Sequence, residues 1–285
     1  MSTVLVTGAR GLLGSTLMQT LSEAGMTTIA LESDLRNREE VMKEVERVAP
    51  QAIVHAAACT DVAYCEAHPE DAHAVNVLGT RTLVEAAKTA GARIIYISTA
   101  SVFDGHEGNY REEDAPAPQN IYSRTKLEGE QEVARYERGL TLRLVLIGVH
   151  KNGSRGKNFI EWILDQLRTN TDMTLFMDAR MNALSNWTVA RYIGRILTEG
   201  VETPVLHLGS RDIHSKADVG KLIAGRFPGY TGTLREASIS TIQDGVRRPK
   251  EMWLNTDKAV SLLGLMPTLT EELACIEEHG GFTIR

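Results

Sequence analysis

The sequence predicts an α/β protein in which a doubly wound parallel sheet is accompanied by a smaller mixed α/β lobe. Short apolar segments alternate with longer amphipathic ones, which is typical of parallel strands connected by helices. The chain of 285 residues is long enough for a large core. The alternation is regular before His150 and less regular after it. We therefore expect residues 1–150 to form mainly the sheet half and residues 151–285 mainly the smaller lobe, with some segments returning to the sheet half.

The first three elements form a βαβ unit. The apolar run 3–7 predicts a strand, the apolar stripe over 11–24 a helix, and residues 28–32 a second strand. Gly25 ends the helix between them. The same periodicities then predict a helix over 38–48, a strand over 52–55, a helix over 80–90 and a strand over 93–98.

After Gly105 the composition changes to a polar, proline-containing loop over 107–120. Loops of this length often shape a binding site. The chain then enters a helix that begins near Tyr122, followed by a strand over 140–146. The second half predicts helices over 158–168, 189–199, 216–224 and 257–263.

Charge and composition exclude several classes of function. The net charge of −6 is spread over mixed acidic and basic residues, so we expect no nucleic-acid or membrane partner. With no secretion signal and no long apolar run, we expect a soluble cytoplasmic protein. Cys59, Cys65 and Cys275 are sparse and lack paired spacing, which argues against a disulfide framework. The histidines form no metal-binding motif, so we expect no bound metal.

Three glycines predict a phosphate cradle. Gly8, Gly11 and Gly14 lie between an apolar strand and a helix start, where they allow a tight turn and close approach of a pyrophosphate. The helix N-terminus attracts the phosphates, so Leu12 and Leu13 join the expected cofactor contacts. This pattern is typical of a Rossmann-type NAD(P)-binding domain. We therefore expect residues 1–150 mainly to bind the dinucleotide and residues 151–285 mainly to form a substrate-binding lobe.

The sequence leaves the choice between NAD(H) and NADP(H) open. Glu32, near the end of the second strand, is placed to accept hydrogen bonds from the adenosine ribose and to repel a 2′-phosphate. Arg10, inside the loop, is placed to pair with that phosphate. Each is also interpretable as a solvated surface charge.

A second motif supplies proton-transfer chemistry. Tyr122 and Lys126 lie four residues apart on a predicted helix and share a face, so the ammonium is expected to lower the phenol pKa. A tuned tyrosine can protonate the oxygen of a carbonyl that receives hydride. The strand over 93–98 ends at Ser98 and Thr99, either of which can hold that oxygen.

With these residues, the chain resembles the extended short-chain dehydrogenase/reductases, and within them the dTDP-4-dehydrorhamnose reductase family. Beyond the glycine loop and the Tyr122/Lys126 pair, the supporting stretches are 55–62, 66–76, 98–99, 102–105, 110–112 with Pro116 and Pro118, 126–130, Asn158-Phe159, and Arg248-Pro249 followed by Leu254. The resemblance implies Thr99 as the hydroxyl of a catalytic triad, Tyr122 as its acid and Lys126 as the electrostatic partner.

The resemblance also implies the remaining contacts. The expected cofactor residues are Asp34 and Leu35 around the adenine, Ala56, Ala57 and Ala58 at the third strand end, Ser98 beneath the nicotinamide, and Asn76, together with Tyr122 and Lys126. The small alanines are equally explained by core packing. The expected substrate residues are Ser101, Asn158 and Arg248. Residues 151–157 are interpretable as a cover over a nucleotide diphosphate or as an ordinary loop.

Three departures from the family pattern fall on the sugar side. Ala100-Ser101 follows Thr99 where the family has Asp-Tyr, and the strand around Arg143 to Ile147 lacks a tryptophan. Ala63-Tyr64-Cys65 also replaces a family aspartate. The reaction type is therefore better supported than the identity of the sugar.

The sequence thus predicts an NAD(P)H-dependent reductase of a keto group on a nucleotide-linked deoxysugar, possible as a homodimer by family resemblance. One alternative is a dinucleotide-binding regulatory subunit similar to the methionine adenosyltransferase β subunit. Another is a nucleotide-sugar epimerase with tightly held cofactor. His55 is expected to be a neutral, backbone-bonded histidine of a buried strand and not a proton relay.

Overall fold

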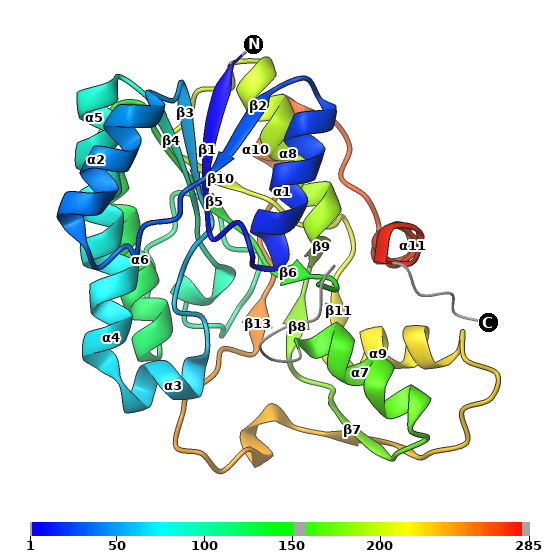
Figure 1. The fold of residues 1–285 in the computed structure, drawn as a ribbon. Helices are drawn as coiled ribbons and strands as arrows, with labels where there is room; N and C mark the ends of the chain where they lie inside the picture. The colour runs from blue at the N-terminus through cyan, green and yellow to red at the C-terminus, as the bar shows by residue number, and fades with distance from the viewer. Residues whose placement is uncertain (1, 151–157, 281–285) are drawn as a thin grey trace.

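A parallel sheet forms the centre of the computed structural model, which describes residues 2–150 and 158–280 (Figure 1). Its strand order is β10-β5-β4-β3-β1-β2, and every adjacent pair is parallel. The strands are β1 (Thr3–Thr7), β2 (Thr27–Ala30), β3 (Ala52–His55), β4 (Arg93–Ile97), β5 (Gly139–Arg143) and β10 (Val205–His207). The strand order reverses between β1 and β3, the position where open α/β sheets bind ligands beyond their carboxyl ends.

Helices cover both faces of this sheet, which confirms the predicted fold class. On one face pack α1 (Leu12–Glu23), α8 (Asn186–Thr198) and α10 (Asp257–Leu263); on the other pack α2 (Arg38–Val48), α5 (Thr80–Ala90) and α6 (Ile121–Val133) (Figure 1). Alternate residues of each strand enter opposite cores: Val4 and Val6 meet α1, whereas Leu5 meets α2 and α5. Strands buried on both faces explain the continuous apolar runs in the sequence.

Between β3 and α5 the chain is helical where the sequence predicted no element. α3 (Val62–Ala67) and α4 (Pro69–His73) lead into a π-helical stretch, Ala74–Gly79, that continues directly into α5. Pro69 opens α4 at its first turn, where its missing N–H costs nothing. The widened turn places Asn76 in the interior, where it is 1% exposed.

A second hydrophobic core lies below the sheet (Figure 1). It is built from α7 (Phe159–Arg168), α9 (Lys216–Ala224) and α11 (Leu269–Gly280), with small strand groups. These groups pair β6 (Leu146–Ile147) with β9 (Leu184–Ser185), β7 (Met173–Phe176) with β12 (Leu234–Ala237), and β8 (Arg180–Met181) with β11 (His214–Ser215) and β13 (Glu251–Met252). Whether residue 150 divides two domains stays a prediction.

Several predicted elements differ at their ends. The strand expected over 140–146 stops at Arg143, and a new strand begins at Leu146 because it pairs with Leu184 in the lower group. The helix expected from residue 189 begins at Asn186, since Ser185 caps it by accepting from the Thr188 amide. The second strand ends at Ala30, so Glu32 lies in the loop that follows.

Over the described parts of the chain, no helix is both long and apolar enough to cross a bilayer.

Candidate functional site

The glycine turn after β1 packs its own backbone segments against each other and against the end of β3. Gly8 adopts φ +66°, and its carbonyl accepts from the Gly11 amide at 2.8 Å. A Cβ on Gly14 would lie 2.0 Å from the Gly8 oxygen, and one on Gly8 would lie 2.9 Å from the Ala57 nitrogen. Larger residues at these positions would therefore displace the turn or the end of β3.

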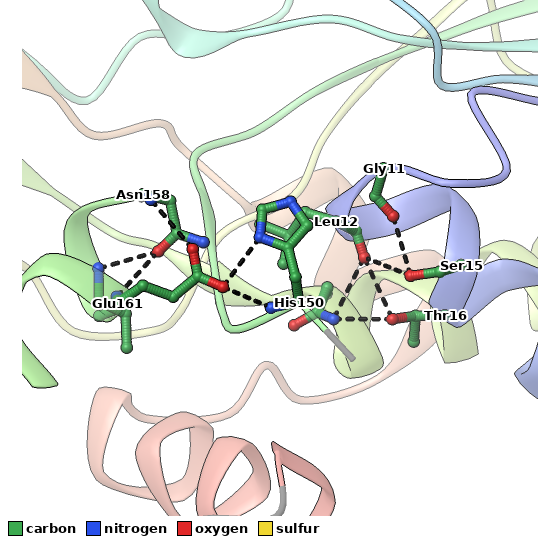
Figure 2. A network of polar contacts seen from close by, with 9 residues as sticks. Gly11, Leu12, Ser15, Thr16, His150, Asn158 and Glu161 are labelled. Atoms are coloured by element: carbon green, nitrogen blue, oxygen red, sulfur yellow. Dashed lines mark hydrogen bonds and ion pairs between the residues drawn. The ribbon is translucent and has the colours of Figure 1, made fainter. Parts of the chain in front are cut away.

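The N-terminus of α1 has the features of an anion site. Gly11 is its N-cap and offers no side-chain acceptor, and the first turn contains no acid. The amides that open the helix are thus free of side-chain caps, as a pyrophosphate requires. From α8, the Asn186 amide donates to the Thr16 hydroxyl at 2.7 Å and to the Leu12 carbonyl at 3.4 Å, which ties the second half of the chain to this turn (Figure 2).

Arg10 and Glu32 contact each other, although the sequence predicts opposite effects of the two on a 2′-phosphate of the cofactor. Arg10 and Glu32 form an ion pair at 3.1 Å, with 86% and 68% of their side chains exposed. Beside them, the guanidinium and amide of Arg36 lower the pKa of Asp34 to about 2. Leu35 is buried and contacts Gly79 closely.

His55 joins the cradle to the neighbouring helix through threonines. Its Nδ1 lies 2.8 Å from the Thr7 hydroxyl oxygen, and its Nε2 lies 3.0 Å from the Thr80 hydroxyl oxygen. Burial lowers the pKa of His55 to about 3, with the nearby Lys126 charge contributing, so the ring stays neutral. The expectation of backbone partners was wrong: both partners are hydroxyls. The Thr7 oxygen also accepts from the Ala57 amide at 3.0 Å, which fixes the end of β3.

Asn76 holds the segment that follows β3. Its Oδ1 accepts from the Cys59 amide at 2.8 Å, and its Nδ2 donates to the Cys59 carbonyl and the Thr125 hydroxyl, each at 3.0 Å. Both donor hydrogens of the amide are therefore used within the protein. Asn76 links the stretch after Ala56, Ala57 and Ala58 to α6 and acts by positioning both.

Thr99 and Tyr122 face each other between β4 and α6. Asn120 caps α6 by accepting from the Ser123 amide at 2.9 Å, which places Tyr122 in the first turn. Burial raises the pKa of Tyr122 to about 12, while a hydrogen bond from Thr99 acts in the opposite direction. The sequence-based expectation of a phenol pKa lowered by Lys126 was therefore wrong: burial dominates.

Lys126 points into the sheet. Its Nζ donates to the Ile97 carbonyl at 2.7 Å and lies 3.9 Å from the centre of the Tyr96 ring. Burial lowers the pKa of Lys126 to about 7, and the carboxylate of Glu130 only partly opposes this. With this pKa, the Lys126 ammonium loses its proton near neutral pH. Lys126 lies one helical turn after Tyr122 on α6.

A chain of hydroxyls and a buried ion pair support these groups. Thr99 Oγ1 lies 2.9 Å from Ser101 Oγ, which accepts from the Ser123 hydroxyl at 3.1 Å. The Ser98 hydroxyl donates to Glu130, whose carboxylate also holds both sides of the Arg143 guanidinium. Ser98 and Ser101 are 5% and 7% exposed, and their contacts with the cofactor and the substrate stay predictions.

On the other side of the site, Asn158 caps α7. Its Oδ1 accepts from the Ile160 and Glu161 amides, and Glu161 in turn accepts from the backbone and ring of His150 (Figure 2). The Asn158 Nδ2 is buried with no hydrogen-bond partner in the described parts of the chain. A buried donor of this kind is free to bind a ligand.

Two cations, Lys216 and Arg248, act on each other electrostatically. Arg248 pairs with Asp244 at 2.6 Å and is drawn electrostatically to Asp61. Lys216, at the start of α9, lies 5.3 Å from the centre of the Phe159 ring. Burial and the Arg248 charge lower the Lys216 pKa, and among the described residues its ammonium has no anionic partner. Residues 151–157, interpreted above as a cover or an ordinary loop, lie outside the described residues.

Sequence reasoning missed three residues of this site. Lys216 carries no motif, and its relation to Arg248 comes from the fold. Asn120 donates from Nδ2 to the Arg247 carbonyl at 2.9 Å and ties the start of α6 to a segment distant in sequence. Glu130 was detectable, since it lies four residues after Lys126 on the same helix face.

The structure describes no cluster of metal-ligating side chains in residues 2–150 and 158–280.

A family model and the full-length relatives of this chain indicate the same protein family. The family model described as RmlD substrate binding domain matches residues 1–277. A probable low-salt glycan biosynthesis reductase of Haloferax volcanii is 30% identical over 95% of this chain and 96% of its own. A dTDP-4-dehydrorhamnose reductase of Sinorhizobium fredii is 31% identical over 81% of each chain.

Two further similarities bear on fold and function. The crystal structure of a dTDP-4-dehydrorhamnose reductase of Clostridium acetobutylicum superposes with a TM-score of 0.88 at 25% identity, over 98% of this chain and all of that one. The methionine adenosyltransferase 2 subunit beta of Mus musculus is 36% identical, but only over 46% of this chain and 42% of its own.

Proposed function

We propose that this chain, which belongs to the RmlD substrate-binding-domain family of extended short-chain dehydrogenase/reductases, reduces a keto group on a nucleotide-linked deoxysugar. The family is one of NAD(P)-dependent oxidoreductases. The finer assignment draws on the reductase names of its full-length relatives and on the arrangement of Thr99, Tyr122 and Lys126.

The observation that carries the proposal is the Thr99–Tyr122 pair at the carboxyl end of β4. Bound NAD(P)H, for which the glycine turn and the uncapped α1 N-terminus fit, would supply a hydride. Tyr122 then protonates the oxygen that develops negative charge, and Thr99 donates a hydrogen bond to the same oxygen. Lys126 places positive charge one helical turn away.

The protonation of Tyr122 suits a proton donor. With its pKa raised to about 12, Tyr122 is a phenol throughout the neutral range. An epimerase would use the same residues, so the sugar assay below, and not this pKa, separates the two activities.

The nucleotide end of the substrate has its own candidate groups. The unused Nδ2 of Asn158 and the Lys216 ammonium carry donors without anionic partners in the described chain, and the Arg248 charge acts on Lys216. Clustered donors of this kind suit a diphosphate. This supports a nucleotide-diphosphate sugar over a small keto acid.

The test is turnover of purified protein with NADH or NADPH and a panel of dTDP-, GDP- and UDP-linked 4-keto sugars. The proposal expects oxidation of the reduced nucleotide with one of these sugars. On that sugar Tyr122→Phe should lower kcat by about 10²- to 10⁴-fold, while titration shows unchanged NAD(P)H binding. Full turnover by Tyr122→Phe would reject the mechanism.

The regulatory alternative makes a different prediction in the same assay. A subunit similar to the methionine adenosyltransferase β subunit would bind NADPH without consuming it on any sugar. It would also change the activity of an added methionine adenosyltransferase. An epimerase would interconvert sugar isomers with no net consumption of nucleotide.

A further inference from the structure

Two thiols meet beside the proposed site. The Sγ atoms of Cys59 and Cys65 lie 3.5 Å apart, and the Cys65 thiol also lies 3.6 Å from the Cys59 carbonyl. The sequence offered no reason to pair them, since the six-residue separation matches no known motif. The turn after β3 and the start of α3 bring them together: Asp61 caps α3 by accepting from the Tyr64 amide at 2.9 Å.

The two thiols differ in access. Cys59 is half-buried, whereas Cys65 is 0% exposed. A dissolved oxidant therefore reaches Cys59 first, and Cys65 stands behind it at contact distance. Burial and the hydrogen bond to Cys59 raise the pKa of Cys65 to about 12, so it starts as a neutral thiol.

We propose that Cys59 and Cys65 form a reversible disulfide with small-molecule disulfides, such as oxidised glutathione, as the oxidant. The Cys59 sulfur attacks oxidised glutathione: a mixed disulfide forms, the glutathione S–S bond breaks, and one glutathione leaves as the thiol after taking up the proton that Cys59 gives up. The Cys65 sulfur then attacks the Cys59 sulfur and displaces the second glutathione, which takes the Cys65 proton. Two protein thiols are oxidised and one glutathione disulfide is reduced to two thiols.

Closing the bond moves groups of the proposed site. A disulfide is about 2.05 Å long, so the sulfur atoms must approach by roughly 1.5 Å. The Cys59 backbone cannot shift alone, because Asn76 holds both its amide and its carbonyl and reaches Thr125 in α6. Thr125 lies between Tyr122 and Lys126 on that helix. The Cys59 and Cys65 sulfurs also act electrostatically on Tyr122, which places them near its phenol.

We therefore expect oxidation to lower activity. A displacement of about 1 Å of reacting groups can cost on the order of 10²-fold in rate, and a loss of at least about tenfold is expected here. This effect on turnover rests on the proposed function, whereas disulfide formation itself does not.

The chemical test uses a Cys275→Ser background, in which only Cys59 and Cys65 remain. After incubation with oxidised glutathione and removal of excess, intact mass should fall by two hydrogen atoms, alkylation of unfolded protein should label no thiols, and dithiothreitol should restore both. A stable glutathione adduct or two unmodified thiols would overturn the proposal. Cys59→Ser and Cys65→Ala in the same background should each fail to lose the two hydrogens.

The functional test compares each variant before and after the same treatment. The Cys275→Ser protein should lose NAD(P)H-dependent turnover reversibly, and Cys59→Ser should keep its own starting activity. NADPH binding, followed by nucleotide fluorescence, gives a readout that needs no sugar. A disulfide that forms without altering turnover or NADPH binding would reject the coupling to the site, whereas absence of turnover in every reduced sample would reject the proposed function instead.

Discussion

Glu130 and Arg143 form a two-sided ion pair behind the proposed site. Arg143 donates from Nε to Oε1 at 3.0 Å and from its terminal nitrogen to Oε2 at 2.7 Å, and both side chains are 6–7% exposed. The same carboxylate accepts from Ser98 and faces Lys126, while Arg143 stacks 5.1 Å from the Phe103 ring centre. One carboxylate thus orients the end of β4 and the proposed catalytic helix together.

Glu130→Gln should destabilise the protein strongly. It leaves the buried Arg143 charge without its partner, which typically costs about 3–5 kcal/mol in the free energy of unfolding. Urea denaturation measures the change. The matched control is Glu39→Gln, which breaks the exposed pair with Lys43 and should change little. Similar effects for the two variants would contradict the assigned burial.

Lys126 should produce a pH dependence near neutrality. Its pKa is lowered to about 7, so the ammonium is lost as pH rises through 7. If the charge aids the reaction, kcat/KM of the free enzyme falls on that side. Lys126→Arg keeps its charge at all these pH values and should remove the limb. A flat wild-type profile between pH 6 and 8.5 would show that this charge does not matter.

Gly14→Ala should weaken cofactor binding. Its Cβ would meet the Gly8 oxygen at 2.0 Å, so the cradle must open. We expect the NADPH dissociation constant to rise at least about tenfold, or 1.4 kcal/mol, and stability to fall by about 1–3 kcal/mol. Gly194→Ala on α8 is the control, because its nearest neighbour would be a leucine methyl at 3.4 Å. Titration and thermal melting should separate the two variants.

His55 and His207 should make stability sensitive to mild acid. Burial lowers the pKa of each to about 3, with Lys126 contributing at His55 and Arg143 at His207. An unfolded histidine gains a proton below about pH 6.5 and the folded one does not, so stability is lost as pH falls from 6.5. The slope is about 1.4 kcal/mol per pH unit for each histidine. His55→Gln should reduce this slope between pH 6.5 and 5, above the usual carboxylate range.

Local pattern was enough to predict most elements of the sheet half, but not α3, α4 or β10. The helices over 38–48 and 80–90 and the strand over 52–55, predicted from apolar periodicity, match the structure residue for residue. In the structure, the Asn37 side chain caps the first of these helices and Gly91 ends the second. The small strands of the second half are two to four residues long, too short to show a period. α11 also went unpredicted, although its apolar face packs in the second core.

The candidate site also has features that the sequence could predict and features that it could not. The positions of Tyr122 and Lys126 followed from spacing on one helix, but their protonation did not, because burial is a property of the assembled fold. The contacts of Asn76 and Lys216 depend on long-range packing that no local motif encodes. The thiol pair depends on the turn after β3.

The exposed Arg10–Glu32 pair has a consequence for how such proteins change over time. The two side chains that the sequence predicts to face a 2′-phosphate sit in solvent and hold no part of the core, so substituting them should cost folding almost nothing. On that prediction, single surface substitutions would exchange one dinucleotide for the other and leave the proposed catalytic residues unchanged.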